Sequence, residues 1–415
     1  MANFIDVLRS GAWLTRERIR FVALTLLAFA LVGVVFTVVT ATGLNDRLGR
    51  PLGTDFSSFY AAGTLVHDGL AAQAYDRAAH FAREQAIFGS ATQFYIFPYP
   101  PFFLLLAAAL ALLSYPAALI VWQGASLALY LLSIRAIVRS ARANPGRLWL
   151  PLALAFPAVL INLGHGQNGF LTAGLFGFAL VALERRPLLA GVLFGVLAYK
   201  PQFGLMIPLV LVATGQWRAV ATAVATVAAL TLATLAAFGP QVWQAFLATT
   251  SFTRAAVLEQ GGIDWFKMQS MFSWMRLWDI PVASAYAVQG VVTLAAAAGL
   301  VWLWRSRASY ALKAAALGLG TLLATPFCFD YDLMLLAPAI AFLAVDGAAR
   351  GFAPWQKTIL AALWIVPLFA RSVPEATLIP LAVPVTLTAF ALLLRRAMSE
   401  TGASPFWRFA PRALK

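Results

Sequence analysis

Long apolar runs alternate with short basic connectors along most of this chain. A helix needs roughly 20 apolar residues to cross a bilayer, and the first run, Phe21 to Thr42, is long enough. Cytoplasmic loops of membrane proteins collect Lys and Arg. The pattern therefore predicts an all-α, multi-pass membrane protein, and the connectors predict which loops face the cytoplasm.

The basic connectors determine the predicted path of the chain. Between two cytoplasmic connectors the chain must cross an even number of times, which leads to about twelve transmembrane helices with both termini inside. The connectors placed inside are the amino terminus, Arg135 to Arg147, Arg185-Arg186, Trp217-Arg218, Arg305 to Lys313, Arg350 to Lys357 and the basic tail 395–415. The expected spans are 21–42, 117–138, 148–164, 168–184, 187–199, 202–215, 219–238, 281–304, 310–328, 332–346, 358–372 and 376–394.

One further apolar run, residues 97–116 (FPYPPFFLLLAAALALLSYP), has two interpretations. As a span of its own, it would place the arginines that follow residue 134 outside. As an interfacial or half-inserted helix on the outer side, it leaves them inside, and we expect this second arrangement because it satisfies the positive-inside rule.

Two long segments then face the outside within a single polytopic domain, 1–415. In the first, 43–116, small, apolar and charged residues recur at helical spacing, which predicts short amphipathic jaw helices on the membrane surface. The second, 239–280, is rich in tryptophan, which indicates interface anchoring or a sugar-binding surface.

Composition agrees with a membrane protein and excludes other classes. Of the 415 residues, 61% are hydrophobic and only 11% are charged, far from the averages of soluble domains. The net charge of +14 comes from residues at the ends of apolar runs, so we expect no nucleic-acid partner. Cys328 is the only cysteine, which excludes an intrachain disulfide and a thiolate metal cluster.

Polar residues at the edges of the spans are the candidates for chemistry, because each is costly there unless it is satisfied. The first is Asp55, in GTDFSSFYAAG. In one interpretation Asp55 serves merely as a helix N-cap. A carboxylate at a helix start also stays ionised, as a general base that takes a proton from an alcohol requires.

The second candidate is the turn NLGHGQNG, which joins two spans. Its glycines either simply end helices or permit a ligand to approach the backbone closely. His165, Gln167 and Asn168 offer hydrogen-bond donors and acceptors without a fixed charge, so we predict that they contact substrate.

The third candidate is LAYKPQFG, where Lys200, Pro201 and Gln202 interrupt an apolar stretch. Each half is about 20 Å long, too short for a lipid-exposed span, so the break must be sheltered. A lysine at this depth needs an anionic partner, unless its side chain extends to the interface. We predict that Lys200 binds a donor phosphate and that Gln202 contacts substrate.

The fourth candidate is TPFCFDYDLMLLAP, with Asp330, Tyr331 and Asp332 at the end of a span. The DxD spacing invites a divalent metal, but no other acidic cluster accompanies it and residues i and i+2 of a helix diverge. We expect substrate contacts here and no metal or other cofactor.

These clusters contain an acid, a base and side-chain amides that can form hydrogen bonds with hydroxyl groups. They contain no nucleophilic triad, zinc-binding spacing or phosphate-binding loop. They suit a membrane enzyme that uses a lipid-linked donor. A transporter or flippase is the alternative, since a broken helix also suits alternating access. A non-catalytic scaffold is a third hypothesis, in which replacing Asp55 would be silent.

The motifs TDFSSFY, YPPF, GQN and KPQ, in this order, resemble glycosyltransferase family 87 of the GT-C superfamily. Similar proteins include polyprenol-phosphate-mannose-dependent α-mannosyltransferases. The resemblance implies a GT-C fold with jaw helices over a lipid-facing cavity, an inverting mechanism and a polyprenyl-phosphate sugar donor. It also implies a lipid or glycan acceptor.

By position, the resemblance makes Asp55 the general base and Lys200 the group that holds the departing phosphate, with Tyr60 of TDFSSFY a further substrate contact. Related mannosyltransferases tend to carry histidine where this chain has Asp330, Tyr331 and Asp332, which leaves the sugar open. The expected location is the plasma (inner) membrane, with the site on its periplasmic, outer face. Neither the identity of the acceptor nor the oligomeric state is predicted.

Overall fold

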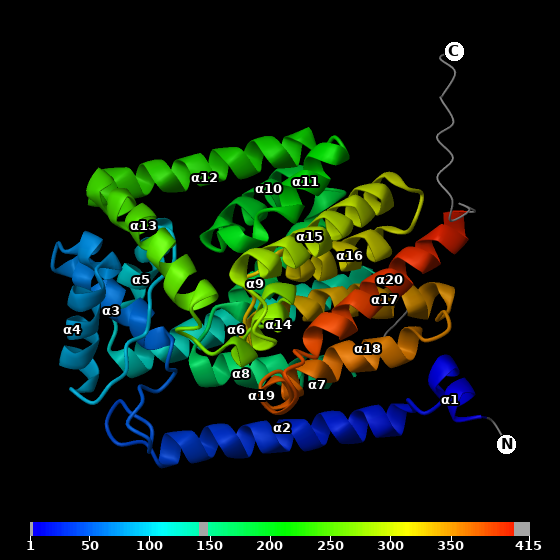
Figure 1. Cartoon of the computed structure of the whole chain (residues 1–415), viewed down its shortest axis with the longest axis horizontal. Helices are drawn as coiled ribbons and strands as arrows, with labels where there is room; N and C mark the ends of the chain where they lie inside the picture. The colour runs from blue at the N-terminus through cyan, green and yellow to red at the C-terminus, as the bar shows by residue number, and fades with distance from the viewer. Residues whose placement is uncertain (1–2, 141–147, 402–415) are drawn as a thin grey trace.

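The protein is a bundle of helices around a continuous apolar core (Figure 1). The computed structural model describes residues 3–140 and 148–401. Within these ranges there is no β-strand, only three isolated bridges. Six helical segments are long and apolar enough to cross a membrane: α2 (Arg16–Val39), α6 (Tyr115–Ser140), α12 (Trp217–Phe238), α15 (Val282–Arg305), η6 with α17 (Asp330–Leu335 and Leu336–Arg350), and α20 (Ala382–Thr401).

Shorter apolar helices complete the membrane part of the described chain. They are α9 (Gly169–Leu183), α10 with η2 (Pro187–Val196 and Leu197–Tyr199), η3 with α11 (Pro201–Phe203 and Met206–Ala213), α16 (Tyr310–Ala324), and α18 with η7 (Gln356–Ile365 and Val366–Phe369). A helix of 15 residues extends only about 23 Å, less than the roughly 30 Å hydrocarbon core. The all-helical membrane fold is confirmed, whereas the number of twelve spans stays a prediction.

Helices in the centre approach one another closely because small residues line their contacts. A Cβ atom at Gly191 of α10 would lie 2.3 Å from the carbonyl oxygen of Ala219 in α12, and one at Gly320 of α16 would lie 2.7 Å from Leu300 of α15. Lipid supplies little hydrophobic drive between apolar helices, so close van der Waals packing of this kind holds them together.

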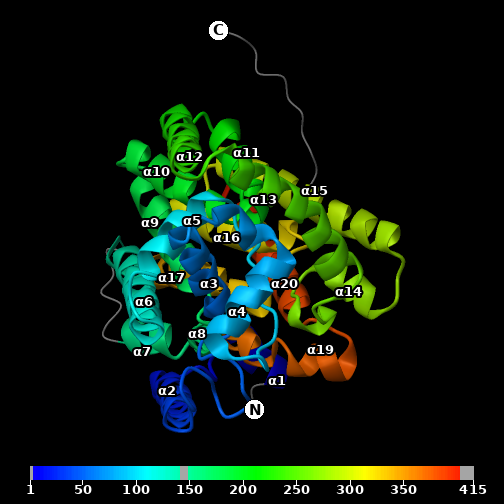
Figure 2. The ribbon, with the colours of Figure 1, turned by 90° about the vertical axis from the view of Figure 1, so that its left-hand side faces the viewer.

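The helix α2 is set apart from this bundle. It runs along one edge of the molecule in Figure 1 and is seen end-on, separate from the rest, in Figure 2. Only 6% of its apolar window is buried. Its contacts are with α7 (Trp149–Leu154) and α8 (Pro157–His165), two short helices in the region where the sequence predicts the third span.

Residues 43–116, which we call the jaw, form the end of the molecule at the left of Figure 1. They contain α3 (Phe56–His67), η1 (Ala71–Tyr75), α4 (Arg77–Phe88) and α5 (Phe102–Leu110). With nine residues, α5 extends about 14 Å, too short to cross a bilayer by itself. It packs instead against α3, with Phe103, Leu104 and Ala107 buried.

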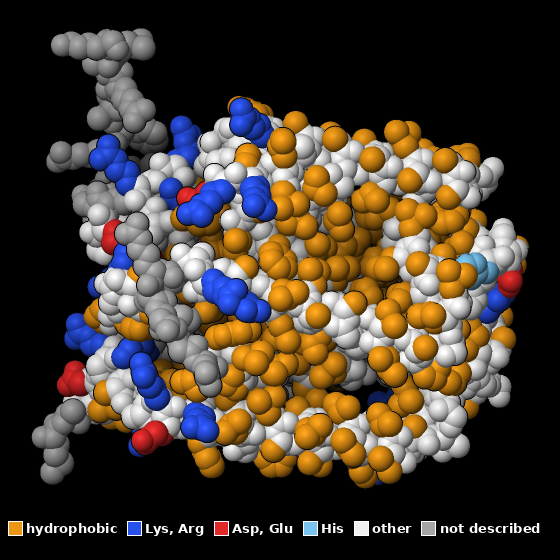
Figure 3. Space-filling view, turned by 180° about the vertical axis from the view of Figure 1, so that it is seen from behind, with side chains coloured by type: hydrophobic (Ala, Val, Ile, Leu, Met, Phe, Trp, Pro, Cys, Tyr) orange, Lys and Arg blue, Asp and Glu red, His pale blue; other side chains and the backbone are white. Residues whose placement is uncertain are grey.

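Residues 239–280 continue the same end of the molecule. They form α13 (Pro240–Thr253), η4 (Arg254–Glu259), η5 (Trp265–Lys267) and α14 (Met271–Leu277), and α13 packs on η1 of the jaw. The remaining described helices are α1 (Phe4–Ser10) and α19 (Ser372–Thr377). Lys and Arg side chains gather at the end opposite to the jaw, and a broad apolar belt separates the two ends (Figure 3).

Candidate functional site

The start of α3 meets the turn that follows α8. The backbone N–H of Asp55 donates to the carbonyl of His165 at 3.0 Å. Gly53 and Gly166 both have positive φ, 68° and 61°. A Cβ at Gly166 would lie 2.5 Å from Cβ of Phe56, so glycine is needed for this approach. These glycines bring the polar side chains of the turn against Asp55.

The carboxylate of Asp55 is held on one side and open on the other. Its Oδ2 accepts a hydrogen bond from Nε2 of Gln167 at 3.0 Å and lies 3.7 Å from Nδ1 of His165, and the side chain is 28% exposed. The N-cap prediction is wrong for this side chain, which accepts no backbone N–H of α3. Asp55 has helical φ and ψ (−70°, −23°) rather than the extended backbone of a typical capping residue.

Gln167 is oriented by two donors. Its Oε1 accepts from the Tyr99 hydroxyl at 3.3 Å and from the backbone N–H of Asn168 at 3.1 Å. Because both partners donate, the amide oxygen must face them, and this assigns the NH₂ group to Asp55. Tyr99 therefore determines how Gln167 presents its donor to the carboxylate.

His165 lies between Asp55 and an arginine from a distant segment. The Nη2 of Arg371 is 2.8 Å from Nε2 of His165. The Nε of Arg371 pairs with Asp330. A guanidinium only donates, so Nε2 of His165 accepts, and this contact assigns the donor role to Nδ1. That N–H faces Oγ1 of Thr54 at 2.7 Å.

Lys200 lies at the helix break, between η2 and η3, and is only 2% exposed. Its ammonium pairs with Asp332 and lies 5.0 Å from the ring centroid of Tyr331. Asp332 also accepts the backbone N–H of Phe329 at 3.0 Å. The anionic partner that a buried lysine requires is thus supplied by the chain itself.

Asn162 joins these parts. Its Nδ2 donates to the carbonyl of Tyr331 at 3.0 Å, and its Oδ1 accepts the backbone N–H of Gly169 at 2.9 Å. The structure thereby brings together four segments that are far apart in sequence: Asp55, the turn 162–169, Lys200 and residues 330–332.

Three other predicted residues lie at different distances from this cluster. Asn168 is buried beside it, with its carbonyl accepting from the Tyr199 hydroxyl at 3.3 Å. Tyr60 lies away from Asp55, since its hydroxyl donates to the carbonyl of Leu113 at 2.9 Å. Gln202 is half-buried in η3, and among the described residues no hydrogen bond joins its side chain to Asp55.

The two carboxylates of the DxD motif point to different cations. Asp330 pairs with Arg371 and Asp332 pairs with Lys200, so the two acids are engaged separately. Within residues 3–140 and 148–401, no group of three His, Cys, Asp or Glu side chains is arranged to hold a metal ion.

An apolar cavity of about 540 Å³ lies between α2 and the bundle, next to the Asp55 cluster. Its walls are Leu26, Phe29 and Ala30 of α2 together with residues of α7 and α8. One region of the lining is polar and consists of His165, Asp330 and Arg371. The cavity therefore combines an apolar surface beside the membrane-exposed α2 with three polar groups, of which His165 lies 3.7 Å from the carboxylate of Asp55; Asp55 itself does not line the cavity.

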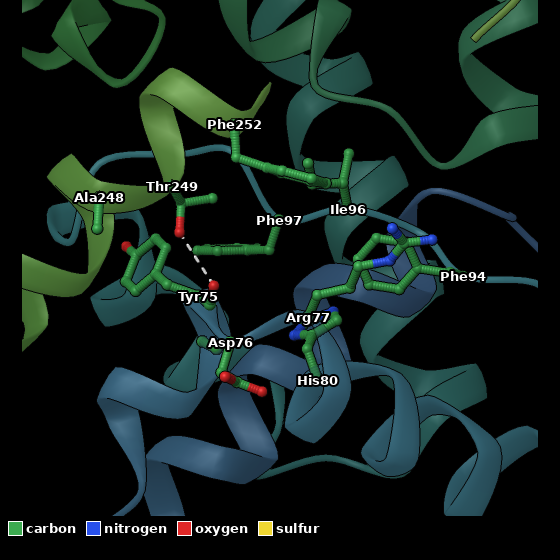
Figure 4. A pocket seen from close by; sticks show the side chains of 11 residues that line it. Tyr75, Asp76, Arg77, His80, Phe94, Ile96, Phe97, Ala248, Thr249 and Phe252 are labelled. Carbon is green, nitrogen blue, oxygen red and sulfur yellow. Dashed lines mark hydrogen bonds between the residues drawn. The ribbon is translucent and has the colours of Figure 1, made fainter. Parts of the chain in front are cut away.

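A second cavity, of about 250 Å³, lies where α13 covers the jaw (Figure 4). Rings of Tyr75, Phe94 and Phe97 surround it, and the Thr249 hydroxyl donates to the carbonyl of Tyr75 at 3.0 Å. Arg77 lies over Phe94, 5.3 Å from its centroid. Asp55 does not line this cavity.

Two titratable groups are buried in the jaw at this cavity: His80 lines it, and Oε1 of Glu84 lies 3.8 Å from Nε2 of His80. Burial lowers the pKa of His80 to about 4. Burial also raises the pKa of Glu84 to about 8, and the negative charge of Asp55 acts in the same direction, against hydrogen bonds from the Tyr95 backbone and Ser57. At neutral pH both groups are uncharged for the most part.

The sequence pattern did not single out Arg371, Tyr99 and Asn162. Tyr99 lies in the YPPF motif, and Asn162 is the first residue of the turn NLGHGQNG. Both could therefore have been identified from the motifs. Arg371 lies at the junction of two apolar stretches, away from the basic connectors. An arginine at the end of the molecule opposite to the basic connectors is the signal that could have identified it.

Comparison with known proteins identifies the family. The model of glycosyltransferase family 87 matches residues 97–326, more than half of the chain. This range contains His165, Gln167 and Lys200, whereas Asp55 and Arg371 lie outside it. Neither the curated proteins nor the solved structures include a match. The chain therefore belongs to glycosyltransferase family 87 and is a membrane glycosyltransferase.

Proposed function

We propose that this enzyme transfers a hexose, with mannose as the expected sugar, from a polyprenyl-phosphate donor to a hydroxyl group of a lipid or glycan acceptor. The observation that carries the proposal is the position of Asp55. Its partly open carboxylate lies 3.7 Å from His165, and His165 lines an apolar cavity next to a membrane-exposed helix, in a chain of a glycosyltransferase family.

The proposed reaction is a single inverting displacement. The acceptor oxygen forms a bond to the anomeric carbon while the bond from that carbon to the donor phosphate breaks, and polyprenyl phosphate leaves with the electron pair. Asp55 takes the proton of the acceptor hydroxyl. Gln167 holds Oδ2 of Asp55, and among the described residues no hydrogen bond engages Oδ1. Oδ1 is therefore the proposed base.

The other predicted residues have supporting parts in the proposal. Hydrogen bonds to hydroxyl groups of the sugar, or the orientation of Asp55, would be the part of His165, Gln167 and Asn168. Lys200 and Asp332, as a buried ion pair, would fix the position of Tyr331 at the site, and no metal or other cofactor takes part. Developing charge on the departing phosphate requires a cation close to the cavity.

The proposed site faces the outer side of the plasma membrane. Lys and Arg gather at the end of the molecule opposite to the jaw (Figure 3), and such an excess is typical of cytoplasmic ends. With that end inside, both termini lie in the cytoplasm, and Asp55, at the start of α3 in the jaw, faces outward.

A transfer assay with purified protein tests this proposal. Protein in lipid nanodiscs is incubated with a panel of polyprenyl-phosphate sugars and extracted envelope lipids, and products are identified by mass spectrometry. We expect transfer from at least one polyprenyl-phosphate hexose, and loss of at least about 1,000-fold in rate for Asp55→Asn, which cannot accept the proton.

Asp68→Asn is the matched control, because Asp68 is an exposed jaw carboxylate paired with Arg83. It should keep the wild-type rate. Transfer by Asp55→Asn at a rate near that of the wild type would remove Asp55 as the base. Transfer from nucleotide sugars alone would overturn the proposed donor class.

A further inference from the structure

Arg371 occupies an unusual place for an arginine in an apolar surrounding. It precedes α19 and lines the cavity beside α2. Its side chain is 39% exposed although Asp330, its partner, is almost fully buried. A guanidinium has five N–H donors, and the contacts to Asp330 and His165 use only part of them. Donors therefore remain for a ligand in the cavity.

The cavity itself is suited to a hydrocarbon chain. Leu26, Phe29 and Ala30 form one wall, and Leu160 and Ile161 of α8 belong to the other. Because α2 packs mainly on α7 and α8 and only 6% of its apolar window is buried, the gap beside it borders the lipid phase. Figure 3 shows the apolar belt hollowed and open near the edge formed by α2.

Apolar walls that end at a guanidinium match one kind of ligand, an amphiphile with an anionic head. The planar fork of arginine suits phosphate oxygens in a bidentate arrangement. A free phosphate would leave the apolar walls without a partner, and a neutral lipid would leave the guanidinium donors unused.

Lys200, the other cation near the site, is not available in the same way. It is 2% exposed, pairs with Asp332 and is absent from the cavity lining. Removing it from Asp332 would leave a buried carboxylate unpaired, which is strongly unfavourable. Arg371 is therefore better placed to bind an anion that arrives from the membrane.

We propose that Arg371 binds the phosphate of the lipid donor, and that the first isoprene units of the lipid lie between α2 and α8. This inference rests on the proposed function and adds the location of the donor to it. His165 contacts both Arg371 and, at 3.7 Å, the Asp55 carboxylate. A phosphate on Arg371 thus places the attached sugar near the base.

Binding of decaprenyl phosphate, which carries no sugar, tests the inference without requiring transfer. Its affinity for the full-length protein in detergent is measured by native mass spectrometry, with decaprenol and inorganic phosphate as comparison ligands. We expect Arg371→Gln to weaken decaprenyl phosphate binding at least tenfold and Arg371→Lys to weaken it less. Arg83→Gln, which removes an ion-paired arginine of the jaw, should leave binding unchanged.

Arg371→Gln leaves Asp330 buried without its cation and could prevent folding. The double variant Arg371→Gln/Asp330→Asn removes both charges together and leaves no buried carboxylate unpaired at this position, so it is the second test. Both variants are compared with the wild type in size-exclusion profile and thermal unfolding. Binding that equals the wild type in the folded double variant would overturn the assignment of Arg371.

Gly164 offers an independent test of the lipid path. It lines the cavity, and nothing lies within 4 Å of a Cβ added there, so a larger side chain can enter the cavity without a clash. Gly164→Phe should weaken decaprenyl phosphate binding at least tenfold. Gly124→Phe, at an equally open position on α6, should not. Normal binding by Gly164→Phe, or inorganic phosphate binding as tightly as the lipid, would place the lipid elsewhere.

The two proposals fail in different ways. Binding that depends on Arg371, with no transfer from any polyprenyl-phosphate sugar, would contradict the proposed function and retain the lipid site. Normal transfer with an unchanged KM for the donor in Arg371→Gln would contradict the lipid site and retain the proposed function.

Discussion

Gln167 is the residue that positions the carboxylate of Asp55 most directly. It donates to Oδ2 of Asp55 only because the Tyr99 hydroxyl and the Asn168 N–H occupy its oxygen. The neutral amide thus holds Oδ2 of the carboxylate in place without introducing a charge that would attract the donor phosphate.

Gln167→Glu changes this contact with almost no change in shape. The new carboxylate faces Asp55 and opposes its ionisation, so the acidic limb of the kcat/KM profile should move to higher pH, with at least tenfold loss at neutral pH. Rates of transfer measured from pH 5 to 9 check this. Gln73→Glu, at an exposed position of η1, is the control, and an unchanged acidic limb in Gln167→Glu would contradict the role of this contact.

The sequence was informative at the level of single residues where a polar group stood alone in an apolar region. Asp55, the turn 162–169, Lys200 and the pair Asp330–Asp332 were all singled out in this way. Their pairing was not predictable, because Lys200 and Asp332 are 132 positions apart and a charge pattern does not specify partners at such a distance. The side-chain cap failed since the backbone of Asp55 depends on its tertiary contact with His165.

Among the elements, the jaw contains two buried groups that make its stability depend on pH. Glu84, with an ordinary pKa of 4.5 that burial raises to about 8, binds more protons in the folded than in the unfolded state between these values. Its contribution to stability is therefore lost as pH rises towards 8. His80, with a pKa lowered from 6.5 to about 4, has the opposite effect, since stability is lost as pH falls from 6.5 to 4.

The two effects oppose each other between pH 4.5 and 6.5, and only Glu84 acts between 6.5 and 8. We expect the free energy of unfolding of the wild type to fall across this upper window by at most about 1.4 kcal/mol per pH unit. The apparent Tm should fall with it. Glu84→Gln should remove the slope. Thermal unfolding in detergent at fixed ionic strength measures it, with the exposed Glu375→Gln as control, and an equal slope in Glu84→Gln would exclude Glu84 as the cause.

Helix boundaries were predictable in proportion to the length of the apolar run. The runs around α2, α6, α12 and α15 are long, and the predicted spans agree with the helices to within several residues. The shorter helices α7, α8, α10 and α11 are broken at residues that pack tightly or bind other segments. Apolar periodicity does not encode such contacts, so their ends could not be placed from sequence.

For the whole molecule, the positive-inside rule and the proposed reaction require the same orientation. A polyprenyl-phosphate donor used on the outer face demands that the jaw and Asp55 lie outside, and the excess of basic residues demands that the opposite end lie in the cytoplasm. Either argument alone could fail, since a cytoplasmic jaw would still form the same internal contacts. Their agreement is therefore a testable property of the fold in its membrane.

Cysteine labelling in intact cells tests this orientation, because the native Cys328 is buried and is replaced by alanine to give a silent background. Ser90→Cys lies in an exposed part of the jaw, and Ala349→Cys lies in an exposed part of α17 near its C-terminal end. We expect a membrane-impermeant maleimide to label Ser90→Cys in intact cells and to label Ala349→Cys only after permeabilisation. The reverse pattern would place Asp55 on the cytoplasmic side and would require a donor presented from the cytoplasmic leaflet.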